Sequence, residues 1–256
     1  MLTAVDVRKR FGGNQVLDGV SIAIEPGEIV GLVGPNGSGK TTMLNCLSGF
    51  VKPDGGEVKL NGRVISGSPA WKISRLGLRR TFQLPRQPMK MTALESMLCG
   101  ASLPIGAKPI GGLLAPRKRR AEEREALERA WELLAVLKPT PVAQTAAGRL
   151  SGGQQKLLSL GVALMDRPDF LLLDEPTAGV NPTLRQSLVN RLLEIRNPKT
   201  SLLIVEHDMG FVGRVCDRVY VLDKGQVIAS CLPSDLMDNP RVVEAYLGAP
   251  RTKTTS

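Results

Sequence analysis

The sequence predicts an α/β protein whose core is a mainly parallel sheet, interrupted by a helical subdomain. Short apolar runs alternate with helical patterns, a glycine-rich stretch joins one such run to a helix, and a long helical stretch spans about 84–166. With 256 residues, of which 42% are hydrophobic, the chain can bury a sizeable core and fits one or two domains.

The N-terminal part of the chain begins this alternation. A helical pattern runs from Lys40 to Ser48 and follows the glycine-rich stretch, so that strand, loop and helix form the first βα unit. The turn signal KPDGGE separates this unit from a further strand-like run. The strands expected here are 2–8, 19–24, 28–33 and 57–60.

The remainder of the chain continues the pattern. Helices are expected at 92–103 and 117–137, on either side of a Gly/Pro-rich loop, and from Ser151, as N-cap, to about Asp166. The run FLLLDEP reads as a buried strand that Pro176 ends. The other expected elements are helix 183–196, strand 201–205, helix 208–215 and strands near 217–223 and 226–230.

The positive charge is concentrated in one region. Residues 59–124 contain 14 Lys and Arg against three acids, which leaves the rest of the chain close to neutral although the whole carries +10. Nucleic acid, an anionic membrane surface and an acidic protein face are candidate partners, and a solvated charged surface is the simpler alternative. An aromatic content of 4% argues against a platform for single-stranded nucleic acid.

Cysteine spacing and hydropathy indicate the compartment. The four cysteines, at 46, 99, 216 and 231, lie far apart, which argues against a metal site or disulfide framework and favours a reducing cytosol. No segment approaches the roughly 18 consecutive apolar residues of a membrane span. We therefore expect a chain that is soluble on its own.

The segment GPNGSGKTT matches the phosphate-binding loop pattern G-x-x-x-x-G-K-[ST] and lies between an apolar strand and a helix. Its glycines let backbone N–H groups surround a phosphate, and the helix N-terminus adds positive potential. Lys40 is expected to neutralise the β- and γ-phosphates, and Thr41 to offer its hydroxyl to Mg²⁺. The expected nucleotide contacts here are Gly34, Pro35, Asn36, Gly37, Ser38, Gly39, Lys40, Thr41 and Thr42.

The strand FLLLDEP supplies two acids at its end. Asp174 is predicted to orient Mg²⁺ or a water bound to it, next to the phosphate loop. Glu175, one residue further, points differently and is predicted to act on an attacking water as a general base. An apolar run followed by two acids is a weak signal alone and gains its meaning from the phosphate loop upstream.

The segment LSGGQQ, at 150–155, puts a serine cap and two glycines at the start of a helix, which makes a second anion cradle without a lysine. With the phosphate loop and FLLLDEP, it resembles the ATP-binding-cassette family, whose signature is LSGGQ. The resemblance runs from Phe11 to Gly248. It implies a P-loop NTPase core with an antiparallel β subdomain and the helical subdomain, in one domain over 1–250 before a polar tail, 251–256.

The resemblance also implies ligands and roles. ATP and Mg²⁺ would bind in a head-to-tail dimer, with ATP between one subunit's phosphate loop and the other's Ser151, Gly152, Gly153 and Gln154. Phe11 matches the aromatic residue that stacks on adenine. Gln83 matches the glutamine that touches Mg²⁺ or water. Asn181 stands where many members have aspartate, which puts a catalytic role for this side chain in doubt.

His207 is the only histidine of the chain, and a lone histidine is usually structural. It lies 33 residues after Asp174, beyond the next expected helix and strand. Because the C-terminal ends of parallel strands share one edge, we expect both residues near the same site. The resemblance implies that His207 contacts the γ-phosphate and, with Glu175, holds the attacking water.

Finer resemblance points to the ATPase subunits of branched-chain (hydrophobic) amino acid importers. It rests on GFVKPDGGEV, GLRRTFQLPRQPMKMTALESML, GGLLAP, AGVNP, VEHDM and NPRVVEAYLG. It implies a peripheral position on the cytoplasmic face of the bacterial inner membrane. The implied partners are two membrane-spanning permease subunits, a second cassette or a copy of this chain, and indirectly a substrate-binding protein.

Other functions stay open on the sequence alone. A urea or short-amide importer and a lipopolysaccharide exporter belong to related branches, and a soluble accessory ATPase of the iron–sulfur assembly type would have the same nucleotide motifs. Leu150 lies only 110 residues after Lys40, without sustained heptads, which leaves no room for the coiled coil of DNA-repair members. No nucleic-acid partner is expected.

Overall fold

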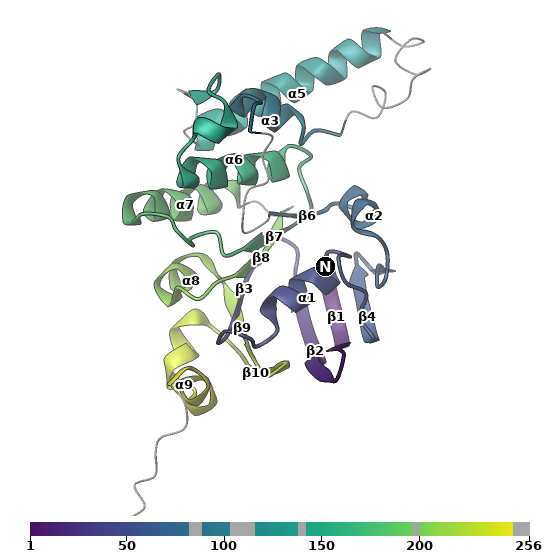
Figure 1. Ribbon diagram of the computed structural model, residues 1–256, viewed down its shortest axis with the longest axis vertical. Coiled ribbons are helices and arrows are strands. Elements are labelled where there is room, and N and C mark those ends of the chain that lie inside the picture. The colour runs from purple at the N-terminus through teal and green to yellow at the C-terminus, as the bar shows by residue number, and fades with distance from the viewer. Residues whose placement is uncertain (82–88, 103–115, 138–141, 197–199, 248–256) are drawn as a thin grey trace, which may run out of the picture. The chain divides into compact units, whose positions relative to one another are not determined.

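The computed structural model describes residues 1–81, 89–102, 116–137, 142–196 and 200–247 (Figure 1). The chain forms two compact units. The first unit comprises Met1–Arg80, Asp169–Thr177 and Leu192–Ser256. The second unit comprises Thr81–Pro168 and Ala178–Arg191, so it extends beyond the helical stretch of 84–166 and takes in most of a later helix.

A six-stranded sheet is the core of the first unit. Five of its strands are parallel, and the strand at one edge runs antiparallel to its neighbour. The three strands next to one another at its centre are buried along their whole length, which explains why their sequences are continuous apolar runs. In order across the sheet the strands are β10 (Gln226–Cys231), β9 (Arg218–Asp223), β3 (Ile29–Val33), β8 (Ser201–Val205), β7 (Phe170–Asp174) and β6 (Leu78–Arg80).

A second, four-stranded sheet in the same unit is antiparallel. It shares one hydrophobic core with the six-stranded sheet and with α1 (Lys40–Leu47), and this core contains Leu17, Leu44 and Leu172. The order of the sheet is β2 (Asn14–Ile24), β1 (Leu2–Phe11), β4 (Gly55–Leu60) and β5 (Arg63–Val64). The other helices of the unit are α2 (Ala70–Arg75), α8 (Met209–Val215), η3 (Pro233–Asp238) and α9 (Pro240–Leu247).

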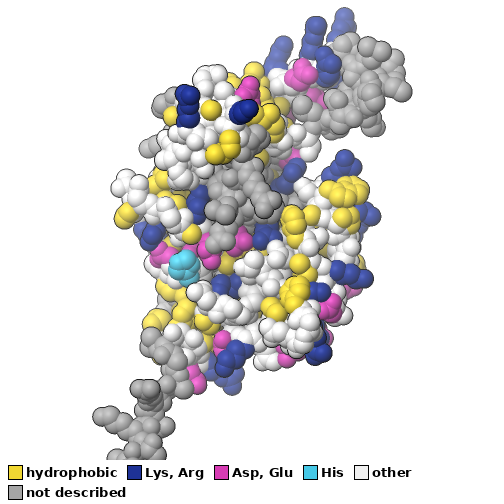
Figure 2. All heavy atoms as spheres, viewed as in Figure 1, with side chains coloured by type: hydrophobic (Ala, Val, Ile, Leu, Met, Phe, Trp, Pro, Cys, Tyr) yellow, Lys and Arg dark blue, Asp and Glu magenta, His cyan; other side chains and the backbone are white. Residues whose placement is uncertain are grey.

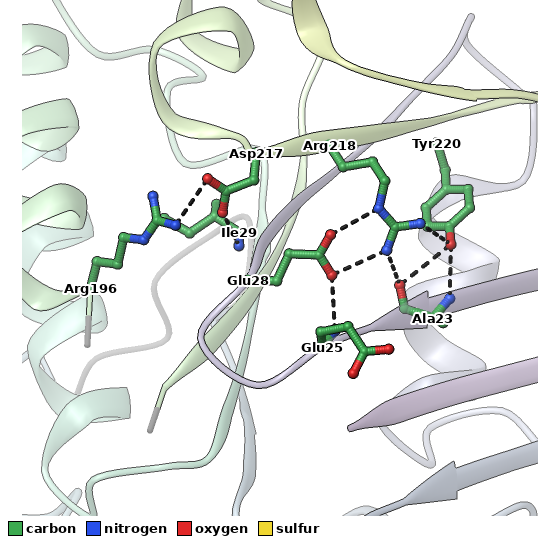
Figure 3. Close-up of polar contacts among 8 residues, drawn as sticks. All are labelled: Ala23, Glu25, Glu28, Ile29, Arg196, Asp217, Arg218 and Tyr220. Carbon is green, nitrogen blue, oxygen red and sulfur yellow. Dashed lines mark hydrogen bonds and ion pairs between the residues drawn. The ribbon is translucent and has the colours of Figure 1, made fainter. Parts of the chain in front are cut away.

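Polar contacts join the two sheets where β3 begins (Figure 3). Arg218 donates to both carboxylate oxygens of Glu28, at 2.8 and 3.1 Å, and to the Ala23 carbonyl of β2, at 3.0 Å. It also donates to the Tyr220 hydroxyl, at 2.7 Å, which itself accepts from the Ala23 N–H at 3.1 Å. Burial raises the pKa of Glu28. The hydrogen bonds from Arg218 and from the Glu25 amide together lower it by more than burial raises it, so the pKa lies below its ordinary value.

The second unit is helical. Helix α6 (Gly152–Leu164) contacts both α3 (Ala93–Leu98) and α5 (Pro116–Leu137). The unit also contains η2 (Ala147–Arg149) and most of α7 (Pro182–Ile195). Within the described stretches of the chain, no helix is long and apolar enough to cross a membrane.

The predicted fold class is confirmed, and so are most of the expected elements. The N-terminal strands are longer than expected, 2–11 and 14–24, because the turn at Gly12 and Gly13 lets both continue into one hairpin. The helix expected at 92–103 ends at Leu98. There Gly100 approaches the Val162 carbonyl so closely that a Cβ would lie 2.3 Å from it. Helices α2 and α9 and strands β5 and β6 were not expected, since each is short.

We predict that Arg218→Ala lowers the free energy of unfolding by about 3 kcal/mol at pH 7, because it leaves the half-buried Glu28 carboxylate without its partner. The depressed Glu28 pKa means that the pair stabilises the fold above about pH 4 and that this contribution is lost as pH falls through the folded-state pKa. The difference in free energy of unfolding between Arg218→Ala and the wild type should therefore be smaller in acid. Urea titrations at pH 7 and pH 3.5 will measure it.

Arg196→Ala is the matched control. Its ion pair with Asp217 is 3.0 Å long and has side chains 43% and 34% exposed, so its removal should cost less than about 1 kcal/mol. Equal losses in the two variants would show that the contacts of Arg218 do not hold the sheets together.

Candidate nucleotide-binding site

Three strand ends of the six-stranded sheet lie at one level. Val205, the last residue of β8, pairs on one side with Leu32 of β3 and on the other with Asp174 of β7. The segments that follow these strands therefore leave the sheet at the same edge. The structure thus brings the predicted phosphate loop, the two acids and the segment of His207 together in the first unit.

The phosphate loop holds Lys40 close to its own backbone. The Lys40 ammonium donates to the carbonyls of Gly34 and Pro35, both at 2.8 Å, and the side chain is 8% exposed. Burial lowers the pKa of Lys40, and the carboxylates of Glu175 and Asp174 raise it by less, so the pKa lies below its ordinary value. The charges of both acids therefore act on the ammonium.

Two further features of the loop suit a bound phosphate. Ser38 Oγ is buried and has no hydrogen-bond partner among the described residues, so it is free to bind a ligand. Gly34, at φ 150°, lies so close to β9 that a Cβ would be 2.0 Å from the Leu222 carbonyl. Gly225 in the turn after β9 donates to the Ser38 carbonyl at 3.0 Å, which braces the loop from that side. Thr41 is exposed on the first turn of α1.

Asp174 is buried and forms an ion pair that sequence reasoning missed. Its Oδ2 accepts a hydrogen bond from Arg80 of β6, at 2.8 Å, and both side chains are 7% exposed. Glu175, directly after it, has a left-handed backbone, with φ 45°, and its N–H donates to the Val205 carbonyl at 3.0 Å. A non-glycine residue held in this conformation is strained, and such strain is frequent at functional positions.

A second buried acid, Glu206, was also missed and connects two of the strand ends. One of its carboxylate oxygens accepts from the N–H and the hydroxyl of Thr177, at 2.8 and 2.6 Å. The other accepts from the N–H of His207 at 3.0 Å. Glu206 is 0% exposed, whereas the His207 side chain is 62% exposed and appears on the surface in Figure 2. The buried carboxylate therefore fixes the backbone that presents the exposed histidine.

The serine and glycines of the LSGGQQ segment lie in the second unit, where Ser151 caps α6 as predicted. Its hydroxyl accepts from the Gln154 N–H at 3.3 Å, and the Gln154 side chain accepts from the Ser151 N–H at 2.9 Å. Ser151 and Gly152 are exposed. Gly153 is buried, and a Cβ there would lie 1.9 Å from the Leu184 side chain of α7, which would have to turn away.

Asn181 has a structural function. Its side-chain oxygen accepts from the Leu184 N–H at 2.9 Å, which makes it the N-cap of α7, with Pro182 as the first residue of the helix. Asparagine and aspartate cap helices about equally well, so the departure from aspartate leaves this helix start intact.

Two aromatic residues belong to segments that contact the phosphate loop. Phe11, the predicted adenine contact, is 48% exposed at the end of β1, with the Lys9 ammonium 5.3 Å from the ring centre. Its hairpin partner β2 contacts the loop, since the Val16 carbonyl lies against Gly39. Burial raises the pKa of Tyr246 to about 12, against an opposing hydrogen bond with the Gly34 backbone. This contact of α9 was not predicted. Gln83 lies outside the described residues.

Comparison with known proteins identifies the family. The chain matches the family described as "ABC transporter" over residues 17–178, more than half of its length. It belongs to the ABC transporter family. It is thus an ATP-binding cassette and an ATPase, as the three motifs predict.

The cassette is similar over nearly its whole length to curated relatives. It is 42% identical to the probable branched-chain amino acid transport ATP-binding protein LivG of Archaeoglobus fulgidus, covering 97% of this chain and 96% of the relative. It is 40% identical to the high-affinity branched-chain amino acid transport protein BraF of Pseudomonas aeruginosa, covering 93% and 94%. LivG of Escherichia coli is 38% identical, with 97% and 98% covered.

Solved structures agree with the fold. An ATP-binding cassette of an ABC transporter in its ADP conformation superposes with a TM-score of 0.83 at 38% identity and covers 97% of this chain and 98% of that one. A nucleotide-free cassette superposes with a TM-score of 0.82 at 37% identity, over 96% and 98%. The predicted P-loop cassette fold is confirmed.

We predict that Glu206→Gln lowers the free energy of unfolding by about 2 kcal/mol. The new NH₂ group faces N–H donors on one side of the side chain, so at least one buried hydrogen bond is lost. Asp208→Asn, two residues away, is the control, because Asp208 caps α8 through the Phe211 N–H and asparagine caps helices about equally well. Denaturant titration should separate the two variants; if Glu206→Gln unfolds like the control, the carboxylate does not hold this edge.

Proposed function

We propose that this cassette is the ATP-hydrolysing subunit of a membrane importer for branched-chain or other amino acids. The observation that supports it best is the identity of about 40%, over nearly complete chains, to LivG and BraF, which are named as branched-chain amino acid transport proteins. These relatives favour amino acid import over the alternatives of urea or amide import, lipopolysaccharide export and iron–sulfur assembly.

At the nucleotide, Lys40 and the backbone of the phosphate loop bind the β- and γ-phosphates, with Ser38 as a further donor. Phe11 stacks on the adenine. Glu175, whose left-handed backbone is strained, accepts a proton from the attacking water. His207, exposed at the same edge of the sheet, orients that water and the γ-phosphate.

The site also suits Mg²⁺. A buried carboxylate, Asp174, and a hydroxyl, Thr41, are hard oxygen groups of the kind that Mg²⁺ prefers, beside a loop built for phosphates. Gln83 is the third proposed ligand. When bound, the ion neutralises charge on the phosphates during transfer. Asp174 holds its place through Arg80, and Thr41 is exposed at the start of α1.

The active form is a head-to-tail dimer. Ser151 and Gly152 are exposed at the start of α6, where free N–H groups and the helix dipole favour an anion. They, with Gly153 and Gln154, face the nucleotide of a second cassette or of a second copy. Dimeric structures of a related bacterial cassette, 25% and 26% identical to this chain, support this arrangement. The dimer works on the cytoplasmic side of the membrane, with two permease subunits and a substrate-binding protein.

We predict that Glu175→Gln binds ATP with near wild-type affinity and hydrolyses it at least about 100-fold more slowly, because a general base is lost while the phosphate contacts remain. Equilibrium binding of a fluorescent ATP analogue and single-turnover hydrolysis will separate the two effects. Near wild-type hydrolysis in this variant would remove Glu175 from the mechanism.

The first turn of α5 is proposed to dock against a membrane-proximal or acidic partner. It carries Arg117, Lys118, Arg119 and Arg120, all exposed, and no acid, and Figure 2 shows Lys and Arg side chains gathered at this end of α5. Each cation here opposes the helix dipole at a cost of about 0.3–1 kcal/mol. Such an unfavourable arrangement is expected where a partner compensates for it.

We predict that reversing these four charges to glutamate releases the cassette from membranes in low salt. The wild type should sediment with membranes of the host, and the variant should stay in the supernatant. Reversal of four exposed cations elsewhere, Lys52, Arg214, Lys224 and Arg241, controls for the change in net charge. Unchanged sedimentation of the α5 variant would exclude the docking role.

Purification of the tagged cassette in mild detergent, with identification of the chains that accompany it, tests the proposed function. Two polytopic membrane subunits and a second cassette are expected. Recovery with soluble scaffold proteins alone would leave the ATPase intact and overturn the transport function.

A further inference from the structure

The carboxylate that we assign to Mg²⁺ already has a cation against it. Arg80 Nη2 lies 2.8 Å from Asp174 Oδ2, and both side chains are almost fully buried. Arg80 is the last residue of β6 and pairs with Leu172 of β7, so the two groups come from neighbouring strands of one sheet. Asp174 lies two residues beyond Leu172 and therefore on the same face of β7, within reach of the arginine side chain.

The guanidinium is also held on its other side. Arg80 Nη1 donates to Asn45 Oδ1 at 2.6 Å and to Ser48 Oγ at 3.2 Å. Both partners belong to α1 or its C-terminal end, the helix that follows the phosphate loop. The guanidinium carbon lies 5.7 Å from the centre of the Phe50 ring. Arg80 is therefore a fixed cation that connects β7 to α1.

Among the described residues, the charges coupled to Lys40 and to Asp174 balance. Lys40 and Arg80 are positive, and Asp174 and Glu175 are negative. A site with no net charge attracts a free divalent cation weakly, whereas the same site without Arg80 would carry one negative charge beside the position proposed for Mg²⁺.

We propose that Arg80 is a placeholder cation: it neutralises Asp174 while the site holds no nucleotide, so that Mg²⁺ enters together with the nucleotide phosphates and not before them. Within the described part of the chain, Asp174 accepts hydrogen bonds through Oδ2, from Arg80, and keeps Oδ1 for the metal or its water. The inference rests on the metal role of Asp174 given under the proposed function.

Arg80→Gln tests the proposal by the binding of Mn²⁺ alone, without nucleotide, measured by electron paramagnetic resonance titration. Mn²⁺ replaces Mg²⁺ as the probe. The wild type should bind Mn²⁺ weakly, and Arg80→Gln should bind it at least about tenfold more tightly, since a neighbouring positive charge has been removed. Arg80→Lys, which keeps the charge, should restore the weak binding of the wild type.

Two controls separate charge at this position from charge in general. Arg79→Gln removes the neighbouring charge on the opposite face of β6 and should leave Mn²⁺ binding unchanged. Arg80→Gln combined with Asp174→Asn should lose the gain. If Arg80→Gln fails to fold, as thermal unfolding will tell, Arg80→Met removes the same charge and keeps the apolar stem.

Equal Mn²⁺ affinity in the wild type and both neutral variants would overturn the placeholder role. In that case, weaker Mn²⁺ binding by Asp174→Asn in the presence of ADP would show that the metal role of Asp174 stands without it. If Asp174→Asn binds Mn²⁺ with ADP like the wild type, both the metal role and the placeholder role are wrong.

Discussion

The register of one buried strand organises the edge of the sheet that carries the candidate nucleotide site. Val205 of β8 pairs with a residue of β3 on one side and with Asp174 on the other, so three chain segments leave the sheet together. A parallel sheet allows no local adjustment here, because a slip of one residue would turn every side chain of the strand to the opposite face. Backbone pairing in the core therefore determines where each candidate site residue lies.

Buried polar groups fix the positions of the loops relative to the sheet. Glu206 links Thr177, just after Glu175, to the backbone of His207, and Arg80 links Asp174 to the helix behind the phosphate loop. Each of these groups is charged, deeply buried and hydrogen-bonded to two segments of the chain. Partly satisfied, such groups would be costly, so they favour a single arrangement of the loops they join.

The sequence predicted the parts of this site that depend on local pattern. The phosphate loop, the acids after FLLLD and the Ser151 cap each have a short motif with a physical reason, and strand alternation placed His207 at the right edge. The roles of Arg80 and Glu206 were not predicted, because their partners are 94 and 29 residues away in the sequence. A single charged residue at the end of a strand also produces no periodic pattern. Helix 92–103 was drawn too long because the backbone contact of Gly100 is tertiary.

The central position of β3 in the sheet determines when the phosphate loop can fold during synthesis of the chain. The phosphate-loop motif is complete by Thr42, yet β3 is paired by β8 and β9, and Gly225 braces the loop. The contact of Arg218 with Glu28 spans 190 residues. A nascent chain on the ribosome therefore contains the phosphate-loop motif long before the loop can fold. It cannot bind ATP until most of its length has emerged from the ribosome. Energy consumption thus begins only with a nearly finished protein.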